Sequence, residues 1–191
     1  MNANPRLLLA CAAAAALVAL TGCDATTPAE KAPAPAQEAS TAQDAAAFSG
    51  TDRPWIEINL AMAEELLPLL DLAPERGTDP ALQQVTAQVR AFTEQELVTL
   101  RMLHDEAELP AVNPHKGMPM PGMVTPEQVT EAAALRDAAF DALLRKCLDE
   151  HLKQGRQLAT SEQTAGTEPR TKALAETILK NREEALANLG K

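Results

Sequence analysis

The chain has 191 residues, a formal net charge of −10, 46% hydrophobic residues and only 2% aromatic residues. This length suits one domain, and the acidic balance argues against nucleic-acid binding, which needs clustered Lys and Arg. The composition, rich in Ala, Leu, Glu, Gln and Lys, favours an all-α protein.

The N-terminus has the features of a lipoprotein signal peptide. Arg6 precedes an apolar run, residues 7–20, that is too short to span a bilayer stably. Leu20-Thr21-Gly22-Cys23 then resembles the bacterial lipobox, in which the chain is cut before the Cys; the alternative is a chance Cys after such a run. We therefore expect residues 1–22 to be a signal peptide, and Cys23 to be the lipidation site that carries fatty acids such as palmitate.

Residues 23–50 predict a lipidated Cys followed by a disordered tether, because they are rich in Ala and Pro and lack helical or strand periodicity. No second long apolar run follows, so the N-terminal lipid is the membrane attachment that we expect. The protein would then lie outside the cytoplasm, in a periplasm or on the outer face of a bacterial cell membrane. Cys147 would be the remaining thiol, which cannot form an internal disulfide.

A helical domain is predicted over residues 51–191, beginning with a hairpin over residues 52–107. Asp52 followed by Pro54 has the pattern of a helix start, and Pro68 is expected to kink this first helix or close it early. Asp79-Pro80 predicts the start of the second helix.

A Met- and Pro-rich linker, residues 110–124, separates this hairpin from a second one over residues 125–189. Thr125 and Gln128 have the spacing of a capping box and predict the start of the third helix. The fourth helix is expected from about Thr171 to Leu189.

The two hairpins form an internal repeat with an offset of 89 residues. This offset carries Met62 onto His151 and Leu69 onto Leu158, and the same offset relates the second helix to the fourth. One offset that serves two helix pairs indicates a duplicated hairpin. Two such hairpins bury their apolar stripes best as an antiparallel four-helix bundle.

A family resemblance follows from Met120-Pro-Gly-Met123, the Thr125 that comes after it, and Phe140-Asp141 leading to His151. With the duplicated hairpin, these features resemble the "domain of unknown function 305" family. The resemblance implies a ferritin-like four-helix bundle and, for some members, copper binding outside the cytoplasm.

The family's hallmark is a His-His pair in the first helix of each hairpin, with a Gln and then Glu-Ile in the second. By position, this sequence has Met62-Ala63 and His151-Leu152 in place of the two His pairs. The remaining family positions hold Thr93 and Glu96-Leu97 in the first hairpin, and Arg182 and Ala185-Leu186 in the second.

Four residues of the predicted core are candidate metal ligands: Met62, Glu96, Cys147 and His151. Thioether, thiol and imidazole groups suit copper, and Cys147 lies one helical turn before His151. The alternative is structural, with Glu96 and His151 satisfying each other, and with Met62 and Cys147 filling the core.

The linker is a second candidate, because His115, Met118, Met120 and Met123 lie within nine residues. Methionine-rich loops with a nearby His are typical of extracytoplasmic copper-handling segments. The alternative is a turn in which the methionines cap one end of the bundle and Gly122 has positive φ.

We therefore expect a non-enzymatic, lipid-anchored bundle that binds or buffers copper or another soft metal ion. The alternative is a metal-free structural or protein-interaction lipoprotein derived from a metal-binding family, with a protein partner that the sequence does not identify. No Ser-His-Asp order, phosphate-binding Gly loop or HExxH helix points to catalysis.

Overall fold

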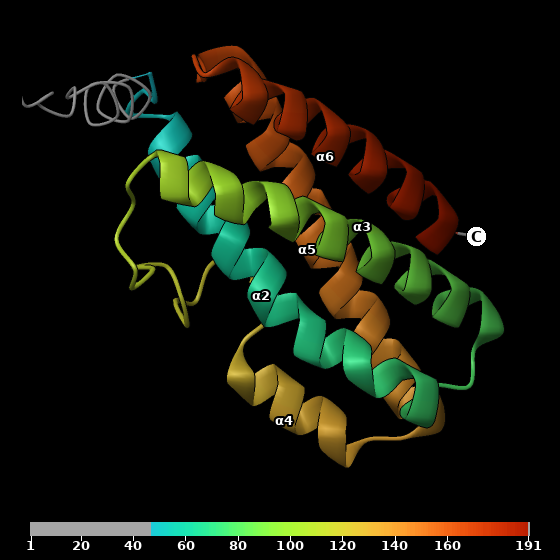
Figure 1. The fold of residues 1–191 in the computed structure, drawn as a ribbon. Coiled ribbons are helices and arrows are strands. Elements are labelled where there is room, and N and C mark those ends of the chain that lie inside the picture. The colour runs from blue at the N-terminus through green and yellow to red at the C-terminus, as the bar shows by residue number, and fades with distance from the viewer. Residues whose placement is uncertain (1–46, 191) are drawn as a thin grey trace, which may run out of the picture. The chain divides into compact units, whose positions relative to one another are not determined.

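The computed structural model describes residues 47–190, which form helices and no strands (Figure 1). The predicted all-α class is confirmed. The expected signal peptide, the lipidation site Cys23 and most of the expected tether lie outside the described residues.

Four long helices pack as a bundle: α2 (Asp52–Arg76), α3 (Pro80–Glu106), α5 (Asp137–Ala165) and α6 (Pro169–Leu189). A short helix, α4 (Pro126–Ala134), packs on α2 and α5. Figure 1 shows α2 beside α3, α5 beside α6, α3 beside α6 and α2 beside α5. Each hairpin therefore lies against the other through both of its helices.

Packed neighbours run antiparallel, as contacts near the helix ends demonstrate. Trp55, near the start of α2, donates from Nε1 to the carbonyl oxygen of Leu158 in α5 at 3.0 Å. Thr78, just after α2, instead contacts Asp141 near the start of α5. Arg170 at the start of α6 pairs with Glu106 at the end of α3.

Local capping explains where two of the helices begin. The Asp79 carboxylate accepts from the backbone N–H groups of Ala81 and Leu82. Thr125 and Gln128 form the complete capping box that their spacing predicts. The expected early closure at Pro68 was wrong, because α2 continues through Pro68 and Pro74 to Arg76.

The third predicted helix is divided into α4 and α5, where the capping box at Thr125 was expected to open a single helix. Leu135 and Arg136 are extended, and Asp137 has φ of 52°. Tertiary contacts drive this break: Val129 and Leu135 pack against the main core cluster, and Arg76 Nη1 donates to the carbonyl of Leu135. The sequence has no Gly or Pro at this break, so its local pattern predicts a continuous helix.

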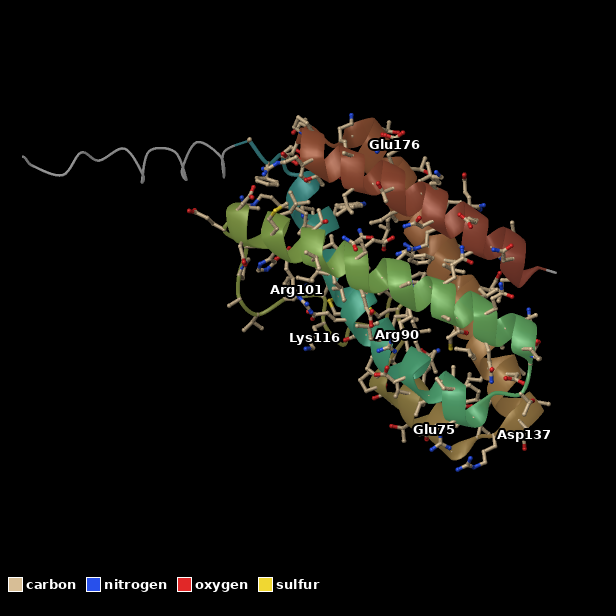
Figure 2. All side chains as sticks on the ribbon, turned by 45° about the vertical axis from the view of Figure 1, so that its right-hand side comes forward. Glu75, Arg90, Arg101, Lys116, Asp137 and Glu176 are labelled. Atoms are coloured by element: carbon tan, nitrogen blue, oxygen red, sulfur yellow. The ribbon has the colours of Figure 1, made fainter. Side chains whose placement is uncertain are left out.

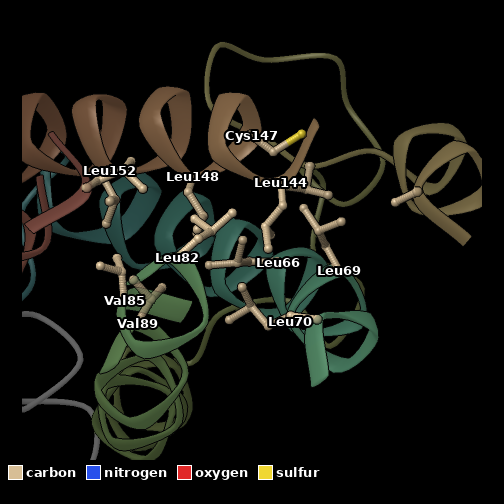
Figure 3. Close-up of a cluster of buried hydrophobic side chains, with 14 of the residues drawn as sticks. Leu66, Leu69, Leu70, Leu82, Val85, Val89, Leu144, Cys147, Leu148 and Leu152 are labelled. Atoms are coloured by element: carbon tan, nitrogen blue, oxygen red, sulfur yellow. The ribbon is translucent and has the colours of Figure 1, made fainter. Parts of the chain in front are cut away.

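The bundle core contains two large apolar clusters. One joins α2, α3, α5 and α6 near the α2–α3 turn, and Figure 3 shows Leu66, Leu82 and Leu148 meeting there. The other surrounds Trp55, Leu100 and Ile178 near the opposite end. Charged side chains such as Glu75, Asp137 and Glu176 lie outside (Figure 2). None of the helices formed by residues 47–190 combines the length and apolar character needed to span a bilayer.

Candidate functional site

His151 lies at the centre of α5 and is 1% exposed. Its Nδ1 is 3.1 Å from the carbonyl oxygen of Gly122. A carbonyl can only accept, so Nδ1 carries the hydrogen and Nε2 keeps its lone pair. Nε2 is buried and has no hydrogen-bond partner among residues 47–190. Burial, with the nearby positive charge of Arg182, lowers the pKa of His151 to about 3, so the ring is neutral at physiological pH.

Methionine side chains gather around the turn that contains Gly122, the hydrogen-bond partner of His151. Met62 and Met123 pack in one buried cluster, and the half-buried Met120 packs against it. Met62 lies opposite His151 on the neighbouring helix, because the bonded pair Trp55 and Leu158 lies seven residues away along each antiparallel helix. The Met120–Met123 turn therefore closes over the two positions that the repeat makes equivalent.

A buried ion pair lies in the same layer of the bundle. Arg182 of α6 donates to both oxygens of Glu96 on α3, at 3.0 and 2.7 Å, and both side chains are almost fully buried. Asn181 donates to the same carboxylate at 2.9 Å, and the guanidinium lies 4.7 Å from the ring centre of Phe92. Each charge is therefore compensated inside the core.

Gly155 makes room for Arg182. A Cβ built on Gly155 would lie 2.9 Å from Arg182 Nε, so the guanidinium stem crosses α5 where that helix has no side chain. Arg182 Nε and Thr93 Oγ1, like His151 Nε2, are buried without a partner in the described part of the chain. On α3, Thr93 and Glu96 lie between Val89 of one apolar cluster and Leu97 of the other. We therefore call this level of the bundle the polar layer; it consists of Met62, Thr93, Glu96, His151 and Arg182.

The other expected ligands lie elsewhere. Cys147 is buried among leucines of the first cluster (Figure 3), and burial raises the pKa of its thiol. Met118 is 45% exposed, and His115 is half-buried beside Asn113 in the linker. Within residues 47–190, no three His, Cys, Asp or Glu side chains are grouped so that they could hold one metal ion.

The family model described as "Domain of unknown function (DUF305)" matches residues 63–191. The chain belongs to the DUF305 family. No curated protein matches it.

Two solved DUF305 structures share this fold. One is a candidate secreted protein from Streptomyces coelicolor, at 17% identity and a TM-score of 0.64, over 73% of this chain and 89% of that one. The other is a DUF305 fragment from Deinococcus radiodurans, at 12% identity and a TM-score of 0.67, over 75% of this chain and 95% of that one. Identities this low establish the fold alone.

The polar layer determines which ligands this DUF305 chain could offer a soft metal ion. Both oxygens of Glu96 already accept hydrogen bonds from Arg182 and Asn181, so we do not count Glu96 among the candidate ligands. His151 offers an unpartnered, neutral nitrogen, and its ring is bonded to Gly122, the chain neighbour of Met123 in the methionine cluster. The structure also gives Glu96 and His151 different partners, so they do not satisfy each other as the structural alternative supposed.

Two acidic clasps hold the hairpins of this DUF305 chain together, and both escaped the sequence interpretation. Asp141 accepts from Thr78 N, Thr78 Oγ1 and Asp79 N in the α2–α3 turn. Asp52 accepts from Thr167 N, Thr167 Oγ1 and Glu168 N in the α5–α6 turn.

The sequence signal for these clasps is a repeated turn. Gly77-Thr-Asp-Pro80 and Gly166-Thr-Glu-Pro169 have the same 89-residue offset as Asp52 and Asp141. Each hairpin therefore fastens its turn to the first long helix of the other hairpin.

Proposed function

We propose that this protein is a lipid-anchored, non-catalytic helical bundle outside the cytoplasm that binds Cu(I) where the Met120–Met123 turn covers His151 and Met62. The main support for this proposal is the buried, unpartnered Nε2 of His151, whose ring is held by a hydrogen bond to the Gly122 carbonyl. A neutral imidazole and uncharged thioethers are ligands that suit Cu(I). The ion would supply no reaction here; the residues bind and retain it.

An opening in the surface supports access to this site. A hollow of about 760 Å³ is lined by Met120, Gly122 and Met123 on one side, and by Glu150 and Gln154 of α5 on the other. The linker turn therefore forms both a wall of the hollow and the cover of His151. An ion could enter there without separation of the long helices.

The direct test is an anaerobic competition titration of the full chain in detergent with a chromophoric Cu(I) chelator. We expect one Cu(I) per chain at micromolar affinity or tighter, and at least about a tenfold loss in His151→Gln and Met123→Leu. Met118→Leu is the matched control, since Met118 lies outside the methionine cluster. Equal retention of Cu(I) by all four proteins would refute the site.

A pair of glycine variants tests the role of the turn. Gly117 and Gly122 both have φ of +73°, but only a Cβ on Gly122 would meet α5, at 2.5 Å from Gln154 Cβ and 2.8 Å from the Glu150 oxygen. A Cβ on Gly117 would have no atom of the described structure within 4 Å. Both Gly→Ala changes strain the backbone alike, so a selective loss of Cu(I) binding in Gly122→Ala would implicate the docked turn.

The lipid anchor is tested separately. The lipobox-like Leu20–Cys23 supports it, and the Streptomyces coelicolor neighbour, a candidate secreted protein, fits an extracytoplasmic location. Metabolic labelling with a fatty acid should mark the wild-type chain in the membrane fraction, while Cys23→Ser should be unlabelled. A labelled Cys23→Ser chain would contradict this assignment.

The second candidate function is a metal-free interaction lipoprotein, and the Glu96–Arg182 pair favours it. The guanidinium already supplies a buried positive charge to the polar layer, which opposes a second cation nearby. This function predicts that the wild type takes up no more Cu(I) than His151→Gln or Met123→Leu does. It also predicts that partner capture from the native envelope survives His151→Gln and fails on surface substitutions.

A further inference from the structure

Glu162 is a buried carboxyl group that no part of the proposed metal site uses. It lies near the end of α5, has 0% exposure, and neither of its oxygens has a hydrogen-bond donor within residues 47–190. A Cβ on Gly166 would collide with Glu162 Oε1, so the carboxyl group is pressed against the backbone of the α5–α6 turn. An ionised carboxylate buried in this way would be strongly unfavourable.

Asp52, the first residue of α2 and itself fully buried, meets the same turn: Glu162 Oε1 lies against Gly166, and Asp52 accepts from the next two residues, Thr167 and Glu168. Both oxygens of Asp52 already accept backbone or hydroxyl donors from Ser49, Thr167 and Glu168. These donors favour the ionised form of Asp52. Two ionised carboxylates cannot hydrogen-bond to each other, whereas a protonated Glu162 can donate to Asp52.

We propose that Asp52 and Glu162 share one proton, which latches the start of α2 onto the α5–α6 turn. Loss of this proton would release the N-terminal segment from this end of the bundle. The latched segment includes Phe48, which is buried in the second apolar cluster, and it leads to the expected lipid attachment. Release would therefore change how the bundle is held relative to its anchor.

The opposite end of the bundle lacks this device. Asp141 occupies the position equivalent to Asp52, but the equivalent of Glu162 is Ala73. The Asp141 clasp therefore contains one carboxylate and three donors from Thr78 and Asp79. The described residues thus provide an internal comparison, because a second fully buried carboxyl group, Glu162, lies at the Asp52 clasp, whereas the Asp141 clasp has Ala73 at that position.

The electrostatic balance at Glu162 agrees with the geometry. Burial, followed by the contact with Asp52, raises the pKa of Glu162 to about 8, and Glu168 adds to the rise while Lys172 opposes it. Burial pushes the pKa of Asp52 upward, but hydrogen bonds from Glu162, Ser49 and Glu168 hold it below its ordinary value. Glu168 is itself paired with Arg170, which also binds Glu106 of α3.

The pH dependence follows from the difference between folded and unfolded chains. An unfolded Glu loses its proton near 4.5, whereas Glu162 in the folded chain keeps it to about pH 8. The folded state therefore binds the extra proton between these values, and the free energy of unfolding decreases as pH rises through them. The lowered pKa of Asp52 affects the free energy of unfolding only at acidic pH, where protonation of Asp52 makes the folded state less stable as pH falls.

The experiment measures urea unfolding of the full chain between about pH 6 and about pH 9.5. Trp55 is the one tryptophan of the sequence and lies three residues after Asp52, so its fluorescence reports on the latch. We expect the wild-type midpoint to fall and Trp55 emission to shift to the red. Glu162→Gln keeps a neutral donor, so it should have a nearly constant midpoint. Exposed Glu183→Gln is the matched control and should follow the wild type.

A measurement on the wild-type protein covers the case in which Glu162→Gln fails to fold. The infrared difference spectrum between the two pH values should contain the band of one protonated carboxyl group that is lost in alkali. Parallel midpoints in wild type and Glu162→Gln, or no such band, would overturn the shared proton. Stabilisation of the wild type by Ca²⁺ at high pH, absent in Glu162→Gln, would overturn it in favour of a cation site.

Discussion

At the scale of single residues, Arg182 has the widest consequences in the core. It neutralises Glu96, covers Phe92 and lowers the pKa of His151 by its charge. A buried ion pair contributes little net stability compared with well-packed apolar residues, yet removal of one partner leaves an uncompensated charge. Glu96 and Arg182 therefore depend on each other, and neither can be replaced alone without leaving a buried charge in the polar layer.

A double-mutant cycle tests this dependence. We expect Arg182→Met and Glu96→Leu each to lower the free energy of unfolding by about 3–5 kcal/mol, because each leaves a buried charge alone. The double variant should be clearly more stable than the sum of the two losses predicts. Urea unfolding measures all four proteins, and strict additivity would contradict a coupled pair.

At the scale of elements, α5 combines helix-forming sequence with one position that the core requires to be small. Gly155 lies in the helix interior, where Gly is about 1 kcal/mol less favourable than Ala. Its lack of a side chain lets Arg182 cross the helix toward Glu96. The packing requirement therefore outweighs the local helix propensity.

Gly155→Ala should consequently destabilise the protein, against the usual trend for a helix interior. We expect a loss of about 1–3 kcal/mol, because the new Cβ would displace Arg182 from its buried pair. Gly50→Ala is the control, since no atom of residues 47–190 lies within 4 Å of the added Cβ. A stabilised Gly155→Ala in thermal unfolding would indicate that Arg182 has another path.

At the scale of the whole molecule, the duplicated hairpins are joined reciprocally by the Asp52 and Asp141 clasps. Each aspartate accepts from the Thr of the opposite turn and from the acidic residue that follows it. The two ends differ in burial, because Asp52 is fully buried while Asp141 is half-buried. Water can replace lost hydrogen bonds only at the Asp141 end.

The clasps should therefore contribute unequally. Asp141→Ala should lower the free energy of unfolding by about 1 kcal/mol, since its donors can turn to water. Asp52→Ala should cost more, because the N–H of Glu168 would stay buried without an acceptor. Urea unfolding at about pH 6–7 compares the free energies of unfolding of the two variants. Equal losses would contradict the role of burial.

Local sequence patterns were sufficient to predict the helical class, the repeated hairpins and the helix starts at Asp79 and Thr125. These features depend on short-range patterns: an apolar period, a cap, a Pro in the first turn. The sequence also identified His151 and the Met120–Met123 turn, but as two separate candidate sites.

Three features depend on contacts between distant parts of the chain: the break between α4 and α5, the pairing of Glu96 with Arg182, and the meeting of Asp52 with Glu162. Leu135 is extended because it packs on the core and Arg76 binds its carbonyl, although the local sequence favours helix. Partners 86 or 110 residues apart are chosen by helix register and burial, which no local pattern encodes. A buried charge must pair with whichever group the packed helices bring beside it, and that group is set by three-dimensional position and not by separation along the sequence.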